Sequence, residues 1–383
     1  MENTSQLILR NEARLPPGAL LLIDPPRDGL LRQLQSPERA VRVSTQDFGN
    51  FRWFLAGGAE AVCEAVPSLA GDERTIILHL PREKERLEML LHAVAAKMNP
   101  ARRVDAQADT AADTAADAGA RLWLVGENRA GIKSAGRHLQ QAFERVVSLD
   151  KARHCGLLEA AGPKTARPFC VDDYARDWSV AHGGREIRLR TLPGVFAHGR
   201  LDRGTALLLE ALEGLSPRGR VLDFACGSGV VGLALLAATE CDLHLTLLDS
   251  SALAIESARR SLTASGLAEQ PVTLLPSDGL CEIGTDARFD WIVSNPPFHH
   301  GVRNDLDVAA KFFRQAGTFL TENGRMVIVF NRHLPYATWL QSAFQGVERL
   351  AESGEFTVMR VSRPVRGTAE IPSGMRRGKG TRS

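Results

Sequence analysis

The sequence predicts an α/β fold in two tandem domains, and three observations support this prediction. Short apolar runs alternate with segments of helical period along both halves of the chain, as in a parallel sheet with helical connections. The length of 383 residues is enough for two domains. In the second half, successive strand-like runs end in polar residues, as they do at the ligand edge of an open α/β sheet.

Composition sets only broad limits on function. With 44% hydrophobic and 24% charged residues and a net charge of +2, the chain is of ordinary globular type, and its charge does not by itself indicate nucleic-acid binding. The cysteines form no C-x-x-C pair, so no metal is expected. The N-terminus lacks a secretory pattern and no apolar run approaches a membrane span, so we expect a cytoplasmic protein with no membrane contact.

Residues 1–163 alternate strand and helix but contain no glycine-rich loop. The clearest elements expected in this segment are three strands, Leu20–Ile23, Thr75–Leu80 and Leu122–Val125, and one helix, Arg82–Met98. The Asp-Pro-Pro after the first strand has no glycine-rich turn ahead of it and is interpreted as a plain turn. We therefore expect an α/β domain without a cofactor site, serving structure or RNA docking, with an alanine-rich insertion at Ala101–Ala120.

Three further segments complete the expected domain organisation. Residues 164–190 mix proline, glycine and charge, and are expected to be a linker. Residues 191–363 are expected to form the second, catalytic domain. The segment 364–383 is expected to be a disordered basic tail, which either contacts phosphate or only aids solubility.

The second domain opens with a strand, a glycine-rich turn and a helix. Asp223 ends the strand, Gly227 and Gly229 form the turn, and Val230–Ala238 is the helix. The turn fits the Gly-x-Gly-x-x-Gly pattern, which alone is weak. Asp249, twenty residues past Gly229, ends the next strand and suits a ribose diol. This combination serves a nicotinamide dinucleotide or S-adenosylmethionine equally well.

Two carboxylates favour S-adenosylmethionine. Asp223 is suited to the cationic amine of its methionine part, whereas an anionic pyrophosphate gains nothing from a carboxylate there. Asp278 follows the next strand, Val272–Leu275, and is suited to an adenine amino group. The predicted cofactor-binding set also includes the neighbours of these groups and the fourth strand end: Ala225, Cys226, Gly227, Ser228, Gly229, Asp249, Ser250, Gly279 and Asn295.

The fourth strand, Phe289–Val293, runs into a stiff turn, Asn295-Pro296-Pro297-Phe298. Two prolines fix φ at successive residues and end the strand. An amide oxygen, a carbonyl and an aromatic face then lie together, which suits a planar group bearing an exocyclic amine. The alternative is an ordinary strand-ending turn. The carboxylates at the three preceding strand ends favour a ligand site instead, and we predict that these four residues are catalytic.

A glycine-spaced loop precedes the expected helix Thr205–Leu212. It is either a domain-entry loop or a segment that folds over a ligand. Its members Phe196, Asp202 and Gly204, with His299 after the proline turn, are candidate substrate or lid residues.

These motifs resemble those of the class I methyltransferases. Asp223–Gly229 is similar to their first cofactor motif, except that Ala225 stands where glycine is usual, and Asn295–Phe298 is similar to their Asn-Pro-Pro-Phe motif. Leu192–Phe196, Val125–Arg129 and His154–Gly156 further resemble the ribosomal RNA small subunit methyltransferase C family, so the resemblance covers both halves.

The resemblance implies two tandem class I methyltransferase-like (Rossmann-like) domains. The second would hold a seven-stranded, mostly parallel sheet with an antiparallel closing pair. It also implies S-adenosylmethionine as cofactor, no metal, and methylation of a guanine N2 in 16S rRNA, free or within the assembled 30S subunit, with no DNA partner. Asn295 and Pro296 would hold the amine, and Phe298 would stack on the base.

Other functions remain open at the level of sequence. A sister family methylates a guanine in 23S rRNA, and Asn331–Leu334 resembles it as well. A nicotinamide-dependent oxidoreductase is less favoured, because it has no use for Asn-Pro-Pro-Phe.

Overall fold

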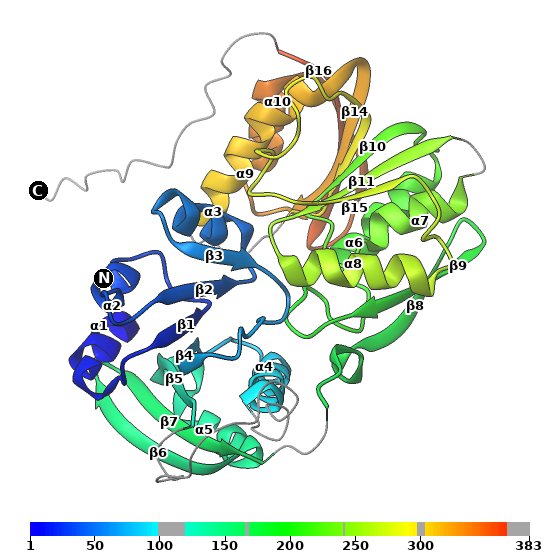
Figure 1. The fold of residues 1–383 in the computed structure, drawn as a ribbon. Coiled ribbons are helices and arrows are strands. Elements are labelled where there is room, and N and C mark those ends of the chain that lie inside the picture. The colour runs from blue at the N-terminus through cyan, green and yellow to red at the C-terminus, as the bar shows by residue number, and fades with distance from the viewer. Residues whose placement is uncertain (99–118, 165–167, 240–241, 297–302, 366–383) are drawn as a thin grey trace, which may run out of the picture. The chain divides into compact units, whose positions relative to one another are not determined.

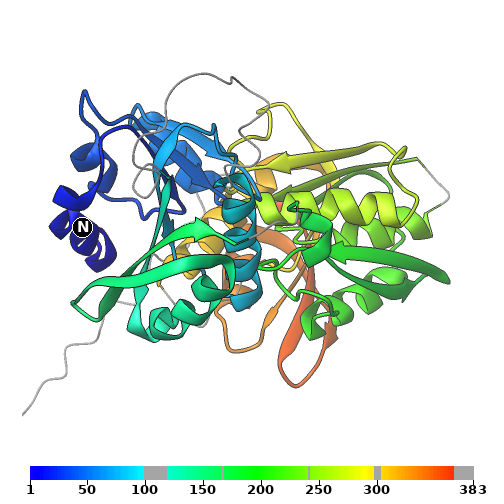
Figure 2. The same ribbon diagram turned by 60° about the horizontal axis from the view of Figure 1, so that its bottom comes forward.

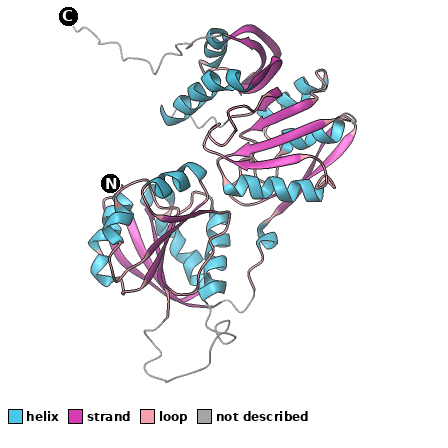
Figure 3. Ribbon diagram, turned by 45° about the horizontal axis from the view of Figure 1, so that its top comes forward, coloured by secondary structure: helices cyan, strands magenta, loops and turns pink. Residues whose placement is uncertain are grey.

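The computed structural model describes residues 1–98, 119–164, 168–239, 242–296 and 303–365, and the side chains of 303–308 are not described. The chain divides into two compact units, Met1–Ala175 and Arg176–Ser383. The alanine-rich insertion, Pro297, Phe298, His299 and nearly all of the basic tail lie outside the described residues. In each unit, strands form a central sheet with helices against it (Figures 1 and 3).

Unit 1 begins with a helix, and its last two strands form a long antiparallel pair (Figure 1). Its elements in chain order are α1 (Asn3–Arg10), η1 (Glu12–Arg14), β1 (Ala19–Ile23), α2 (Leu30–Leu34), β2 (Val41–Thr45), α3 (Phe48–Ala56), β3 (Glu60–Cys63), β4 (Glu73–His79), α4 (Lys84–Met98), β5 (Arg121–Glu127), η3 (Asn128–Ala130), α5 (Ile132–Ala142), β6 (Phe143–Ala152), β7 (Cys155–Pro163) and η4 (Val171–Tyr174).

Unit 2 begins with a two-stranded hairpin and continues into alternating strands and helices. Its elements are β8 (Arg176–His182), β9 (Arg185–Thr191), α6 (Arg203–Glu213), β10 (Gly219–Phe224), α7 (Val230–Ala238), β11 (Leu243–Asp249), α8 (Ala252–Ala264), β12 (Val272–Pro276), β13 (Phe289–Ser294), α9 (Arg303–Ala316), η5 (Gly317–Phe319), β14 (Leu320–Asn331), α10 (Tyr336–Ala343), β15 (Phe344–Glu352) and β16 (Phe356–Pro364).

The two units share one sheet topology. Within the described residues, unit 1 has the seven-stranded order β3-β2-β1-β4-β5-β7-β6 and unit 2 the seven-stranded order β12-β11-β10-β13-β14-β16-β15. In both, the first five strands are parallel and the last two pair antiparallel. The predicted fold class is thus confirmed, including the closing pair of the second sheet.

Alternation along the strands of unit 2 gives the sheet two apolar faces. In β10, Val221 packs with α6, α7, α8 and the hairpin, whereas Leu222 packs with α9 and α10. The same alternation recurs in β13 with Val293 and Ile292. The parallel strands are buried on both faces and therefore appear in the sequence as nearly continuous apolar runs. In unit 1, Leu20 and Leu21 divide between two clusters in the same way.

The prediction that residues 164–190 form a linker is wrong from Arg176 onward. Strands β8 and β9 pair along their whole length, and Ile187 and Leu189 are fully buried in the core of unit 2. Figure 2 shows this hairpin (green) beside helix α8. The alternation of charged and apolar residues in Arg185–Thr191 is visible in the sequence, but the glycines beside it favour a linker there.

Candidate active site

The carboxyl ends of four parallel strands bring the predicted polar residues of unit 2 to one edge of the sheet. Phe224 at the end of β10 pairs with Leu248 on one side and with Ser294 on the other. Asp249 pairs with Pro276 at the end of β12. The chain leaves β10 toward β11 and returns on the other side as β13, so β10 and β13 flank the switch point of the sheet, where α/β proteins bind ligands.

The turn after β10 is built from left-handed residues. Ala225, Gly227 and Gly229 have φ values of 58°, 55° and 81°. A Cβ on Gly229 would lie 2.8 Å from Leu233 Cδ1, and the left-handed backbone at this position favours glycine whatever the space. A Cβ on Gly227 would meet no described atom within 4 Å. Gly227 thus leaves the approach to the N-terminus of α7 open, as a cradle for a bound ligand requires.

Asp249 ties this turn to the end of β11. Its carboxylate accepts hydrogen bonds from the backbone N–H groups of Gly227 and Ser251, both at 2.9 Å. A carboxylate accepts at about four positions, so bonds to the backbone and to a ribose diol are compatible. Ser250 is half-buried beside it, while Cys226 and Ser228 are buried under the turn. Burial raises the pKa of the Cys226 thiol well above its usual value.

Asp223 lies deeper than the other strand-end carboxylates. It is 2% exposed, and its Oδ2 accepts from the Gly232 N–H of α7 at 2.9 Å. The pKa of Asp223 is raised to about 7, mainly because the carboxyl group is buried. The hydrogen bond from the Gly232 N–H opposes this increase, and the nearby Asp249 adds to it. A cation at this position would favour the ionised form and lower that pKa.

Asn295 is held by the start of helix α6. Its side-chain nitrogen donates to Thr205 Oγ1 at 2.8 Å and to Asp202 Oδ2 at 3.3 Å. Asp202 is also the N-cap of α6, because the same oxygen accepts from the N–H groups of Gly204 and Thr205. Next to Asn295, the buried Ser294 donates to Phe224 O at 2.8 Å, which joins β13 to β10 at the switch point.

Sequence reasoning missed Thr205, which it placed only in the apolar helix. Among the described residues, none donates a hydrogen bond to the Asn295 side-chain oxygen, so the amide presents that oxygen as an acceptor. The sequence does contain a signal for the start of this helix. Asp202 is a typical N-cap residue, and Thr205, three positions later, comes just before the apolar run of the helix.

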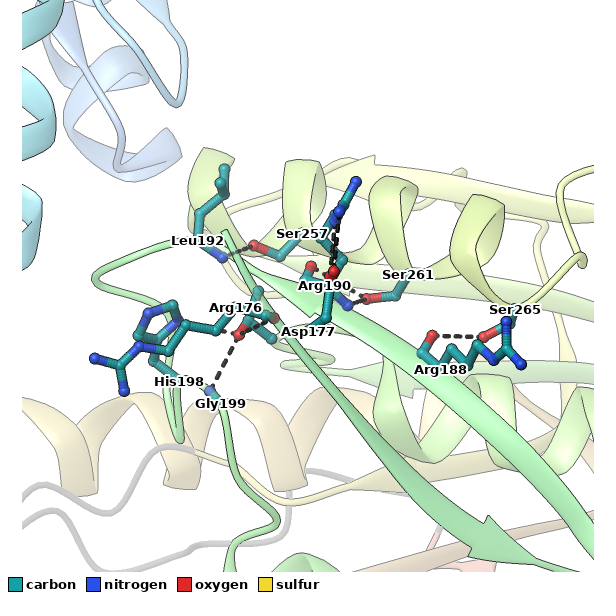
Figure 4. A network of polar contacts seen from close by, with 11 residues as sticks. Arg176, Asp177, Arg188, Arg190, Leu192, His198, Gly199, Ser257, Ser261 and Ser265 are labelled. Carbon is teal, nitrogen blue, oxygen red and sulfur yellow. Dashed lines mark hydrogen bonds and ion pairs between the residues drawn. The ribbon is translucent and has the colours of Figure 1, made fainter. Parts of the chain in front are cut away.

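Strand β9 and the first residue of the loop between β9 and α6 are anchored to three serines in and directly after helix α8. Ser257 Oγ accepts from Leu192 N at 3.0 Å, Ser261 Oγ accepts from Arg190 N at 3.1 Å, and Ser265 donates to Arg188 O at 2.6 Å (Figure 4). Three serines at four-residue spacing thus satisfy the free edge of β9. Phe196 in this loop is 59% exposed.

Asp278 and Gly279 follow β12 at the same edge. Asp278 is exposed, and Gly279 has a φ of 63° with no described atom within 4 Å of the position that a Cβ would take. The buried Ser277 shapes this turn by donating to Gly279 O and accepting from Glu282 N. The roles predicted for these residues stay predictions.

The corresponding edge of unit 1 is arranged differently. Its β1 is followed directly by Asp24, which has a positive φ of 49°, as Ala225 after β10 has in unit 2. Asp24 accepts from Gln46 N and forms an ion pair with the buried Arg86 of α4 at 2.6 Å. A protein guanidinium thus binds the carboxylate that follows the first strand, and no glycine-rich turn comes directly after it. That unit 1 has no cofactor site stays a prediction.

Two further features concern the described part of the chain as a whole. It contains no group of three or more His, Cys, Asp or Glu side chains arranged to hold a metal. None of its helices is long and apolar enough to span a membrane.

The fold of unit 2 and the residues at its switch point define a class I methyltransferase. The family model described as "Methyltransferase small domain" matches residues 186–360, and that described as "Methyltransferase small domain N-terminal" matches 5–105 and 104–178. Ribosomal RNA small subunit methyltransferase C from Pseudomonas entomophila is 34% identical over 95% of this chain and 100% of its own length. The protein of that name from Hahella chejuensis is 33% identical, over 95% and 99%.

The chain therefore belongs to the ribosomal RNA small subunit methyltransferase C family. Among solved structures it is similar to the T. thermophilus 16S rRNA N2 G1207 methyltransferase in complex with AdoMet and guanosine, with a TM-score of 0.77 and 25% identity over 94% of this chain and 92% of that one.

Proposed function

We propose that the protein transfers a methyl group from S-adenosylmethionine to the exocyclic N2 of a guanine in 16S rRNA, in the cytoplasm. The observation that carries this proposal is the orientation of Asn295, whose amide nitrogen is bound by Thr205 and Asp202 and whose oxygen is presented as an acceptor. The names of the relatives and the guanosine bound by the T. thermophilus enzyme support the choice of base and RNA.

The residues at the carboxyl edge fit S-adenosylmethionine. The open approach above Gly227 would admit the cofactor close to the turn, Asp249 would accept from its ribose hydroxyls, and Asp278 would accept from its adenine amine. Asp223, which is buried at the end of β10, would hold the cationic amine, directly or through water. When bound, the cofactor supplies an activated methyl group on a sulfonium.

Asn295 and Pro296 orient the guanine amine. The lone pair of N2 is delocalised into the ring, so the free amine is a poor nucleophile. Its N–H groups donate to the Asn295 side-chain oxygen and the Pro296 carbonyl, which aims the nitrogen lone pair at the methyl carbon. N2 would accept the methyl group and lose one proton to solvent, while the electrons of the broken methyl–sulfur bond would remain on the sulfur of the cofactor. Because the methyl group is already activated, orientation can account for much of the rate.

We assign unit 1 either to RNA docking or to a structural role.

The substrate is either free 16S rRNA or the assembled 30S subunit. Initial rates of methylation measured on these two substrates, side by side, distinguish between them.

The proposal is tested by mapping methylated nucleotides in rRNA from a strain that lacks the gene. One N2-methylguanine of 16S rRNA should be absent, and it should return with the wild-type chain but not with Asn295→Ala. Asn295→Ala should lower kcat at least about 10²-fold while S-adenosylmethionine affinity stays nearly unchanged. Loss of a 23S rRNA methylation instead would transfer the protein to the sister activity, and unchanged rRNA would overturn the proposal.

A further inference from the structure

The loop 192–202 leads from helix α8 to the edge on which the cofactor and the guanine are proposed to bind. At its start, Leu192 N donates to Ser257 Oγ in helix α8, which begins directly after the Asp249 turn. At its end, Asp202 accepts from the Asn295 amide. One end is thus fixed along α8, the helix that follows Asp249, and the other end is fixed at the Asn295 amide, so the loop leads to the proposed site.

This loop has a defined shape. Thr191, which is fully buried, closes its base: its Oγ1 accepts from Gly199 N at 3.1 Å, lies 3.0 Å from His198 Nδ1, and donates to Arg176 O at 3.4 Å (Figure 4). Ala197 has a φ of 55°, a left-handed conformation that residues with a side chain adopt only at a cost in free energy. Such a conformation persists only where the surroundings hold it in place.

Phe196 lies at the centre of this fixed loop. Leu192, Pro193 and Val195 are buried, whereas Phe196 is 59% exposed, the highest value among the described large hydrophobic side chains. Exposed guanidinium groups follow it at Arg200 and Arg203, and Arg203 pairs with the exposed Glu355 at 3.1 Å. A preformed loop therefore presents an exposed aromatic side chain, and exposed guanidinium groups follow it four and seven residues further along the chain.

We propose that Phe196 and Arg200 form a second RNA contact, in which Phe196 stacks on the nucleobase adjacent to the target guanine and Arg200 binds the phosphate beside it. This inference rests on the function proposed above. To reach Asn295, the target guanine must leave the stack of bases in the RNA. Its departure exposes one face of the adjacent nucleobase. Stacking of a base on an aromatic side chain contributes about 1–3 kcal/mol, and a guanidinium beside it pairs with the backbone.

The test uses the full-length protein and a 16S rRNA fragment containing the mapped guanine, with 2-aminopurine at the preceding position in one probe and at the following position in the other. Wild-type protein should quench one of the two probes. Phe196→Ala should abolish this quenching and raise the RNA Kd about 5- to 150-fold. Phe196→Trp should retain both, and the Kd for S-adenosylmethionine should be unchanged in each variant.

A matched pair of arginine variants tests the phosphate contact. Arg200→Ala should reduce the slope of log Kd against log salt concentration by about 0.7 to 1. Arg218→Ala should leave it unchanged, because this exposed residue precedes β10 and lies toward the opposite edge of the sheet. Thermal unfolding confirms that each variant is folded.

Two outcomes separate this inference from the proposed function. If the wild type methylates 16S rRNA but Phe196→Ala binds and quenches as the wild type does, the second contact is wrong and the function stands. If the wild type fails to methylate 16S rRNA, the function is wrong and the contact is overturned with it.

Discussion

The side-chain nitrogen of Asn295 lies 2.8 Å from Thr205 Oγ1, although the two residues are 90 positions apart. Asp202 supplies a second acceptor at 3.3 Å. A carboxylate only accepts, so turning the Asn295 amide over would place its oxygen against a negative charge. The start of α6 therefore fixes which end of the amide points toward the guanine, and it acts on the reaction through Asn295.

Thr205→Val should lower kcat about 10-fold or more, because Thr205 then no longer holds the amide and one hydrogen bond contributes about 1 kcal/mol before any cost of misorientation. Thr205→Ser retains the hydroxyl and should restore most of the rate. The measurement is single-turnover methylation together with calorimetric titration of S-adenosylmethionine. A normal rate for the valine variant would show that Thr205 does not position Asn295.

Asp249→Ala should weaken S-adenosylmethionine binding about 10- to 100-fold, because the variant loses both the proposed ribose acceptor and the bond that holds Gly227 N. Asp278→Ala is the matched comparison. Its exposed carboxylate is proposed to contact only the adenine amine, so its loss should raise the Kd less than about tenfold. Isothermal titration gives both values, and an unchanged Kd for Asp249→Ala would contradict the ribose assignment.

Asp223→Asn should stabilise the cofactor-free protein, increasingly so as the pH rises from about 4 to about 7. With its pKa raised to about 7 against 3.8 for a free side chain, Asp223 keeps a proton in the folded state that the unfolded chain has lost. Wild-type unfolding free energy therefore falls with pH over this window, by a few kcal/mol at most. Asparagine does not ionise, and it can still accept from Gly232 N.

Thermal unfolding of both proteins at pH 4.5 and pH 8 measures this difference, which should be small at the lower pH and larger at the higher. The same variant should bind S-adenosylmethionine more weakly, because a neutral amide offers less to a cationic amine. Equal melting temperatures of the wild type and the Asp223→Asn variant at pH 8 would show that ionisation of Asp223 does not lower the free energy of unfolding.

The fold was predictable to the extent that apolar periodicity reports it. Val230–Ala238 was predicted with the bounds that α7 has, because every residue between the glycine turn and Thr239 is apolar or small. By contrast, β2 (Val41–Thr45) and β3 (Glu60–Cys63) were missed. They are short, and β3, at the sheet edge, has no fully buried residue, so its sequence carries little hydrophobic signal.

The site was predictable where function depends on a residue's place in a strand end. Asp223, Asp249, Asp278 and Asn295 could be assigned to one edge because parallel strands end together. Thr205 could not, because its role depends on how α6 approaches β13, a contact across 90 residues that no local pattern encodes. For the same reason, the serine contacts between α8 and β9 could not be foreseen.

Ala225→Gly should leave stability unchanged or raise it by up to about 1 kcal/mol, contrary to the usual effect of this substitution. At a φ of 58° alanine costs about 1–2 kcal/mol relative to glycine, and the greater freedom of glycine in the unfolded chain offsets part of that gain. Ala234→Gly in helix α7 is the control and should destabilise by about 1 kcal/mol or more. If both variants lose equal stability in urea unfolding, the left-handed conformation at Ala225 is not strained.

Ser257→Ala should release the loop 192–202 from α8. Ser257 is fully buried and accepts from Leu192 N, so alanine leaves a buried N–H without this acceptor, at a cost of about 1–3 kcal/mol. Amide exchange of the peptide that covers residues 192–199 should then accelerate about 5- to 150-fold, as followed by mass spectrometry. Ser265→Ala is the matched control: it removes a bond to Arg188 O at an exposed position, where water replaces the hydroxyl, so exchange should stay near the wild-type rate.

Because the same loop carries Phe196, Ser257→Ala should also weaken RNA binding without altering affinity for S-adenosylmethionine. Accelerated exchange with unchanged RNA affinity would mean that RNA binding does not depend on a preformed loop, whereas unchanged exchange would mean that Leu192 is held by packing rather than by Ser257.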